Sequence, residues 1–216
     1  MRTNTIILAA IAAVALTSCK KNADSSMSQG LDFQLRAVNP SSPVARTMAT
    51  ISWDSGFVNA TLIKFEAKQN GNENEFKSNV HQHVDLFGAA STVGTINITP
   101  GVFEEVEFKV EAAPTSTEPA LKLQGSVNGV PVTFIVNNGF EIKSEQSQVT
   151  LTGGDIALNK IDLSALTNGL SSANFSSATL TNGTVIISSS SNANLFNIMF
   201  SNCQKQGETE VEMHHH

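Results

Sequence analysis

Apolar and polar residues alternate along several segments of the chain, with the period of two expected of strands that bury one face. Residues 31–38 read LDFQLRAV and alternate throughout. After a Pro-Gly pair at 100–101, which favours a turn, Val106, Phe108 and Val110 alternate with charged residues. Each segment is therefore predicted to form a strand, and the charged face of the second strand is expected to lie in solvent.

Further segments are rich in β-branched and aromatic residues, which favour strands. Residues 121–127 and 130–136 flank an Asn-Gly pair, which suits a type I′ hairpin turn because both residues tolerate positive φ. A second turn at 137–139 leads into a strand at 140–143, so the sequence predicts a three-stranded antiparallel meander. Additional strands are predicted at 57–67, 148–152, 155–161 and 184–188.

Helical periodicity is confined to two short segments near the C-terminus. In residues 192–203, apolar side chains recur on one helical face after a stretch rich in Ser and Asn. Residues 163–170, with Ser164 as the candidate N-cap, are the second segment. Many short strands and few helices predict a mainly β fold, an antiparallel β-sandwich with one or two short helices near the C-terminus.

The N-terminal segment has the layout of a bacterial export signal. Arg2 precedes an apolar run at 6–16, which as a helix would span only about 16 Å and is too short for a bilayer core of about 30 Å. It is therefore predicted to be the core of a signal peptide. The residues that follow, Leu-Thr-Ser-Cys at 16–19, resemble the lipobox of bacterial lipoproteins. The alternative is an ordinary cleaved signal followed by an incidental cysteine.

The lipobox resemblance implies cleavage before Cys19 and attachment of lipid to its thiol. Residues 1–18 would then be removed as a lipoprotein signal peptide, and Cys19 would hold the protein to a membrane, most simply the outer membrane. Residues 19–30 are small and polar and are predicted to form a flexible tether. Whether the protein faces outward or toward the periplasm is left open by the sequence.

The folded β-sandwich domain is predicted to span residues 31–205, followed by a disordered tail at 206–216. One interior segment, APTSTEP at 113–119, has the composition of a linker. It either divides two small domains or joins two halves of one sandwich. A single domain is favoured because each half alone would have only about 85 residues, which buries little apolar surface.

Composition and motifs argue against several functions. The formal net charge of −6 is the wrong sign for nucleic-acid binding, which requires a basic surface. The chain has no Gly-X-Ser-X-Gly motif and no glycine-rich phosphate loop between a strand and a helix. Neighbouring carboxylates such as Glu104 and Glu105 would face opposite sides of a strand and could not act on one substrate. A protein without enzymatic activity and without a cofactor is therefore expected.

Three side chains are candidates for ligand binding. His81 and His83 are separated by one residue and would share a face of a strand, from which two imidazoles can chelate a metal. The alternative is an ordinary solvated polar strand. Trp53, the single tryptophan in a chain without tyrosine, is either a core residue or a lone platform for stacking a sugar. Cys203 follows apolar residues at helical spacing and is expected to be buried.

Several longer motifs occur in a fixed order after the lipobox. They are ISWDSGFVNATLIKFEA at 51–67, VDLFG at 84–88, GTINITPGVFEEVEFKVEA at 94–112 and IISSSSNANLFNIM at 186–199. In this order they resemble small lipoproteins of Bacteroidota that carry the domain of unknown function DUF4382. The resemblance implies an immunoglobulin-like or transthyretin-like sandwich and supplies no established catalytic residues.

Together these features predict a lipid-anchored β-sandwich module of the cell envelope that is not an enzyme. It would bind, or be presented to, another macromolecule, either protein or glycan, through loops or an edge strand. The alternative is a surface lipoprotein that captures glycan through Trp53 or metal through His81 and His83. An envelope hydrolase is the third candidate, and it would need a Ser or Asp cluster that only the fold assembles.

Overall fold

A computed structural model of the chain describes residues 29–38, 51–205 and 212–214. The predicted signal peptide, Cys19 and nearly all of the predicted tether lie outside these residues. The mainly β fold predicted from the sequence is confirmed. Within the described residues, no helix is long and apolar enough to cross a membrane.

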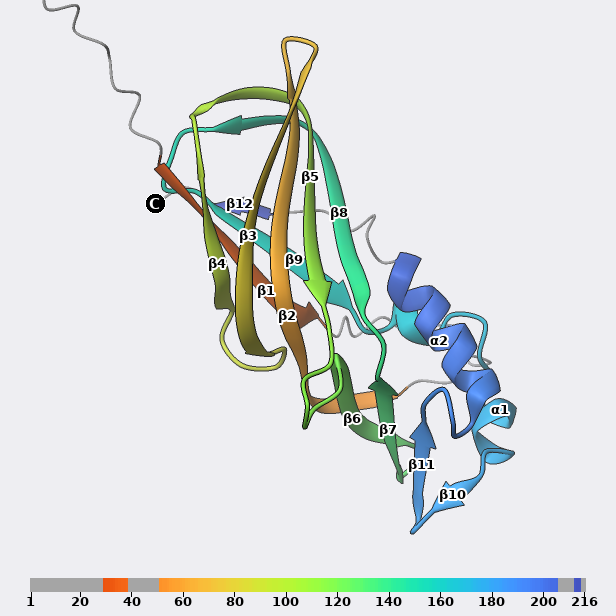
Figure 1. Cartoon of the computed structure of the whole chain (residues 1–216). Coiled ribbons are helices and arrows are strands. Elements are labelled where there is room, and N and C mark those ends of the chain that lie inside the picture. Colours follow the sequence, from red (N-terminus) through yellow and green to blue (C-terminus); the bar gives the residue numbers. More distant parts are fainter. Residues whose placement is uncertain (1–28, 39–50, 206–211, 215–216) are drawn as a thin grey trace, which may run out of the picture.

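The described residues form strands almost throughout, with short helical segments only after β9 (Figure 1). The helical segments are η1 (Ala165–Thr167), α1 (Ser172–Ser176) and α2 (Ala193–Lys205). The strands are β1 (Gln29–Val38), β2 (Ser52–Gln69), β3 (Asn72–Asp85), β4 (Ser91–Ile98), β5 (Gly101–Ala112), β6 (Leu121–Val127), β7 (Val130–Val136), β8 (Phe140–Leu151), β9 (Ile156–Asp162), β10 (Leu180–Thr181), β11 (Thr184–Ile187) and β12 (Glu212–His214).

Strand β2 organises the larger sheet because it is long enough to pair with three other strands. Antiparallel β3 follows it along one edge, after a tight turn. Along the other edge, the first part of β2 pairs with β6 and the second part pairs with β5. Strands β5 and β6 therefore lie end to end beside one continuous strand (Figure 1).

Strands β7 and β8 repeat this end-to-end arrangement one position further out. β7 pairs with β6 through the predicted turn, whose residues Asn128 and Gly129 have φ of 50° and 80°, as type I′ requires. β8 pairs with β5 over its whole length. The four strands are thus the two arms of one long hairpin, and each arm is interrupted once near its middle.

The predicted meander is wrong in its third strand. Residues 137–139 have turn composition, but they carry the chain onward from β7 into β8 and do not reverse it. The free edge of β7 is instead occupied by β11, which runs parallel to it. The strands predicted at 140–143 and 148–152 are consequently one strand, β8, since β5 offers a partner along all of it.

One face of this long sheet has two covers, one on each half of its length. In the upper half of Figure 1 the smaller sheet, with strand order β12-β9-β1-β4, packs against it, and the Phe33 and Phe108 rings lie 5.7 Å apart across the sandwich. In the lower half the helical segments take over, and Phe134 of β7 meets Phe196 of α2 at 5.9 Å. Phe140 of β8 lies on the same side of the sheet as Phe108 and meets Phe200 of α2. Both covers therefore lie on the same side.

The C-terminal predictions are confirmed in part. The helix predicted at 192–203 is α2, and Cys203 on its inner face is buried, which raises the pKa of its thiol to about 12. Only the short η1 forms within the predicted helix at 163–170, because Gly169 at φ 84° ends it. The tail prediction is wrong for residues 212–214, which form β12 against β9.

The junction of β2 with β6 depends on a glycine. A Cβ atom on Gly125 would lie 2.2 Å from the carbonyl oxygen of Ser52. We expect Gly125→Ala to lower the free energy of unfolding by about 2–4 kcal/mol in urea denaturation, because backbone must move to relieve the overlap. Ser126→Ala at the next position is the control, and equal stability of the two variants would contradict this account of the junction.

Candidate functional site

The residues that the sequence singles out for ligand binding do not form a site. Trp53 is 4% exposed and belongs to the core, opposite Gly125 of β6. Of the two alternatives that the sequence leaves open for Trp53, the ring is therefore the core residue and not an exposed stacking platform. Trp53 lies opposite Gly125, which in turn lies opposite Val132 of β7, so the ring is on the face of the sheet that the helical segments cover.

His81 and His83 lie exposed on β3. The His83 ring stacks on Phe57 at 4.2 Å, and its Nδ1 lies 3.1 Å from Oε2 of Glu118. Among the described side chains, no group of three or more His, Cys, Asp or Glu residues is arranged to hold a metal ion. The pair thus gains no third ligand from this part of the fold, and the metal site stays a prediction without geometric support.

Glu118 belongs to the predicted linker, which is a loop on the outer face of the long sheet. We call the face opposite the second sheet and the helical segments the outer face. The loop leaves β5 and returns into β6 next to the same residue of β2. The backbone N–H of Asn59 donates to the carbonyl of Ala120, and the backbone carbonyl of Asn59 accepts from the N–H of Ala113. The Asn59 side chain, 5% exposed, donates to the carbonyl of Pro119 at 2.9 Å. The loop is therefore held against β2, and His83 holds it from β3 through Glu118.

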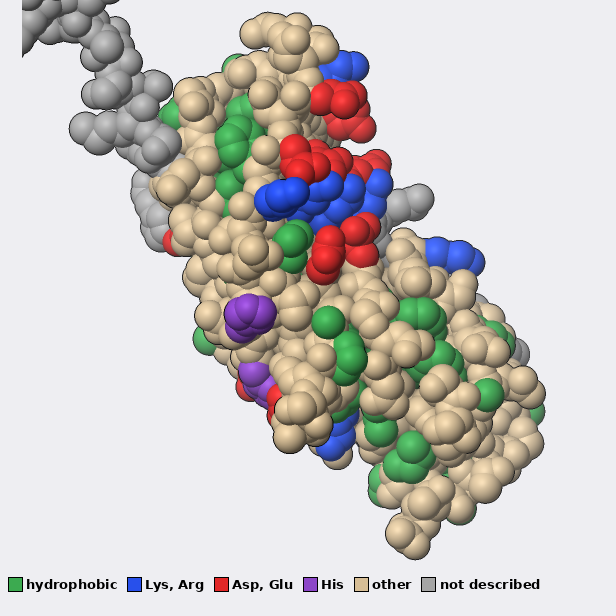
Figure 2. Space-filling model, in the orientation of Figure 1, with side chains coloured by type: hydrophobic (Ala, Val, Ile, Leu, Met, Phe, Trp, Pro, Cys, Tyr) green, Lys and Arg blue, Asp and Glu red, His purple; other side chains and the backbone are tan. Residues whose placement is uncertain are grey.

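The outer face of β3, β2, β5 and β8 carries a regular pattern of charged side chains. Two rows of like charge cross these strands at right angles, and every step in each row is an in-register cross-strand pair. Figure 2 shows them as adjoining bands of blue and red. The lysine row is Lys77, Lys64, Lys109 and Lys143, and the glutamate row is Glu75, Glu66, Glu107 and Glu145.

Like charges on neighbouring strands repel, and the two rows offset this by pairing with each other. Among the described residues the ion pairs form one continuous zigzag from Lys77 on β3 to Glu145 on β8, in which every interior member has two partners and each end has one. Lys64, for example, lies 2.5 Å from Glu66 and 2.8 Å from Glu75. We call this network the charge zigzag.

The charge zigzag perturbs its own titration. Hydrogen bonds from Lys64 hold the pKa of Glu66 and the pKa of Glu75 below the ordinary value. The bond from Lys143 does the same to the pKa of Glu145. In turn, Glu66 raises the pKa of Lys64. These three carboxylates and Lys64 therefore stay charged over a wider range of pH than they would in isolation.

The sequence carries a signal from which the zigzag could be predicted. Four triplets place a Lys and a Glu on either side of one residue: KFE at 64–66, EFK at 75–77, EFK at 107–109 and KSE at 143–145. Their order reverses wherever the strand direction reverses, so antiparallel pairing brings like charges into rows. Three middle residues are phenylalanines, and Phe65 meets Phe76 at 6.1 Å and Phe108 at 5.1 Å.

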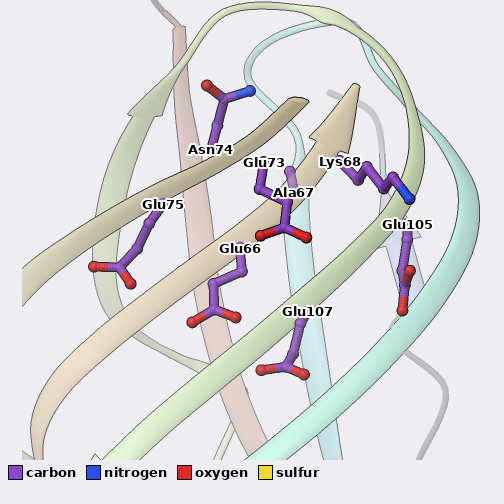
Figure 3. Close-up of a pocket in the computed structure, with 8 residues that line it drawn as sticks. All are labelled: Glu66, Ala67, Lys68, Glu73, Asn74, Glu75, Glu105 and Glu107. Atoms are coloured by element: carbon purple, nitrogen blue, oxygen red, sulfur yellow. The ribbon is translucent and has the colours of Figure 1, made fainter. Parts of the chain in front are cut away.

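Beside the glutamate row the outer face is hollowed into a depression of about 500 Å³ (Figure 3). Figure 3 shows Glu66, Glu75 and Glu107 pointing to the same side from three strands. Glu73 and Glu105 complete its acidic lining, and Lys68 between them is the only basic residue among the described residues that line it. Its openness and charge suit a basic group of a large partner better than an enclosed small molecule.

Comparison of the chain with protein-family models, with curated proteins and with solved structures finds no match. The resemblance to DUF4382 lipoproteins therefore stays a prediction. Any functional proposal therefore rests on the described fold and surface.

The charge zigzag should make stability depend on acid. Because the pKa values of Glu66 and Glu75 are lower in the folded chain than the ordinary value of 4.5, their contribution is complete above about pH 4.5 and is lost as pH falls below it. We expect the urea midpoint to fall between pH 5 and pH 3, and to fall less in Lys64→Gln, which removes a partner of both carboxylates. Lys122→Gln is the control, and equal slopes for Lys64→Gln and the wild type would contradict this assignment.

The loop at 113–119 should depend on the Asn59 side chain. Asn59→Ala leaves the Pro119 carbonyl without its donor, and we expect a loss of about 1–2 kcal/mol in the free energy of unfolding. Proteinase K should then cut the native protein within the loop sooner than it cuts the wild type. Asn79→Ala, an exposed asparagine on β3, is the matched control. Unchanged cleavage in Asn59→Ala would show that other contacts hold the loop.

Proposed function

We propose that this protein is a lipid-anchored module of the cell envelope that binds a protein partner through the outer face of its long sheet and is not an enzyme. The lipobox-like segment supports the anchor at Cys19 in the outer membrane. The observation that carries the binding role is the openness of the outer face (Figure 2). One side of the sheet is covered by a second sheet and then by helices, whereas the described residues leave the other side largely in solvent.

The outer face carries charged side chains that are not paired within the zigzag and are available to a partner. Eight residues neutralise one another pairwise in the zigzag. Around it the exposed carboxylates of Glu73, Glu105, Glu111 and Glu141 form no ion pair among the described residues, and Lys68 lies opposite two of them. The face is therefore net acidic and fits a partner that presents basic groups.

The dimensions of the face favour a macromolecule over a small ligand. Specific protein interfaces are broad and mostly flat, with about 800 Å² on each partner. The sheet supplies such a surface on rigid strands, whereas the acidic depression on it is open to solvent. Capture of glycan through Trp53 is disfavoured because that ring is buried, and capture of metal through His81 and His83 lacks further ligands among the described residues.

Photo-crosslinking in the native cell tests the proposal. A photoreactive amino acid placed at Glu105 or Glu111, both exposed on β5, should give an adduct of one reproducible higher mass. The same substitution at Asn97, exposed on β4 of the other sheet, is the matched control and should not give it. No adduct from either face position, or the same adduct from Asn97, would refute binding through the outer face.

The anchor is tested in the same cells by Cys19→Ser. We expect this variant to leave the membrane fraction and to lose its crosslinked adduct. Retention of Cys19→Ser in the membrane fraction would refute anchoring through lipid, independently of the result with the photoreactive positions.

A further inference from the structure

Strand β3 is an open edge of the long sheet. In the described residues it pairs with β2 alone, and its residues are mostly exposed. Side chains near its start are well exposed, at 64% for Lys77 and 45% for Glu75. An edge strand presents unpaired backbone N–H and C=O groups, which a further strand can use.

The turn before β3 decides which backbone groups face outward. Asn70 and Gly71 have φ of 52° and 75°, as a two-residue type I′ turn requires, and Gln69 lies opposite Asn72. The backbone N–H of Asn72 therefore points toward β2. Because the direction alternates along an antiparallel strand, the backbone groups of the odd-numbered residues 73–79 point away from β2, into the open edge.

The open stretch ends where β3 meets β4. At Val80 and His81 the pairing with β2 is irregular, and Val80 packs against β4, since a Cβ on Gly94 would lie 2.9 Å from it. Residues 72–79 are thus the part of β3 that a new strand could reach.

We propose that residues 72–79 of β3 pair antiparallel with the same segment of a second copy of this chain, with Lys77 opposite Glu75 of the second copy. The two-fold axis then passes beside Phe76. The inference concerns self-association and does not depend on the partner of the outer face.

Charge selects this register. Only outward-facing residues can share a ladder, so the registers differ by steps that set one odd-numbered residue against another. One such register sets Glu75 against Glu75 of the second copy between two attractive contacts of Lys77 with Glu73, and another sets Lys77 against Lys77 of the second copy, so each contains a repulsive pair. The proposed register instead creates two Lys77–Glu75 contacts related by symmetry.

The charge zigzag ends unfilled at this edge. Among the described residues Lys77 has one partner, Glu75 of its own strand at 3.4 Å, whereas interior members of the zigzag have two. Glu75 of the second copy would supply the missing partner, so the two zigzags would join into one across the dimer. A ladder this short binds weakly in solution, but confinement of both copies to one membrane raises their effective concentration.

Charge reversal tests the pairing. The full chain, as processed by the cell, is purified in density-matched detergent and its mass is followed with concentration by sedimentation. We expect a reversible dimer, and we expect Lys77→Glu and Glu75→Lys each to raise the dissociation constant at least about tenfold through like-charge contacts. An equimolar mixture of these two variants should recover the dimer, because each supplies the charge that the other lacks.

Glu145→Lys at the far end of the zigzag is the matched control. It also reverses an end member with one ion pair, but it lies on β8 and should dimerise as the wild type does. Misfolded variants could not recover on mixing, so the mixture separates pairing from folding. A wild type that stays monomeric at the highest concentration reached, a mixture that does not recover, or an equal loss in Glu145→Lys would each overturn the proposal.

Discussion

The long sheet depends on the backbone pairing of β2. This strand must satisfy hydrogen bonds on both edges, and its second edge is shared between two strands that are separated by eight residues of sequence. Asn59 sits at the joint, where its backbone bonds to both strand ends and its buried amide bonds to the loop between them. Because a buried backbone group without a partner is costly, the interruption occurs where one residue can serve both sides.

The same triplets that build the core also build the surface. In KFE and EFK the phenylalanine points into the sandwich while its two neighbours point out, so the aromatic contacts among Phe65, Phe76 and Phe108 fix the register in which the charged rows meet. A slip of one residue would bury the charges and expose the rings. The charge zigzag is therefore ordered because the core beneath it is ordered. That rigidity makes the outer face and the β3 edge suitable for recognition.

The sequence marks candidate residues by their chemistry, but their tertiary surroundings decide what each of them does. Trp53 is rare enough to attract attention, yet it lies in the core because β2 begins beneath the helical cover. His83 contacts Glu118, which lies 35 residues further along the chain and could not be paired with it by spacing alone. The acidic depression and the charge zigzag draw on several strands, and none of their parts forms a recognisable motif by itself.

Local physics was sufficient for what the sequence determined by itself. Alternation predicted the strands, Asn128-Gly129 predicted the β6–β7 hairpin, and apolar spacing predicted α2 with Cys203 buried. Each of these depends on residues within a few positions of one another. Only the tertiary structure decided that β8 pairs with β5 and not with β7, and that four separate triplets align as rows. Which strands pair depends on which sheet edges are free in the fold, and those edges come from distant parts of the sequence. Local composition does not indicate which edge is free.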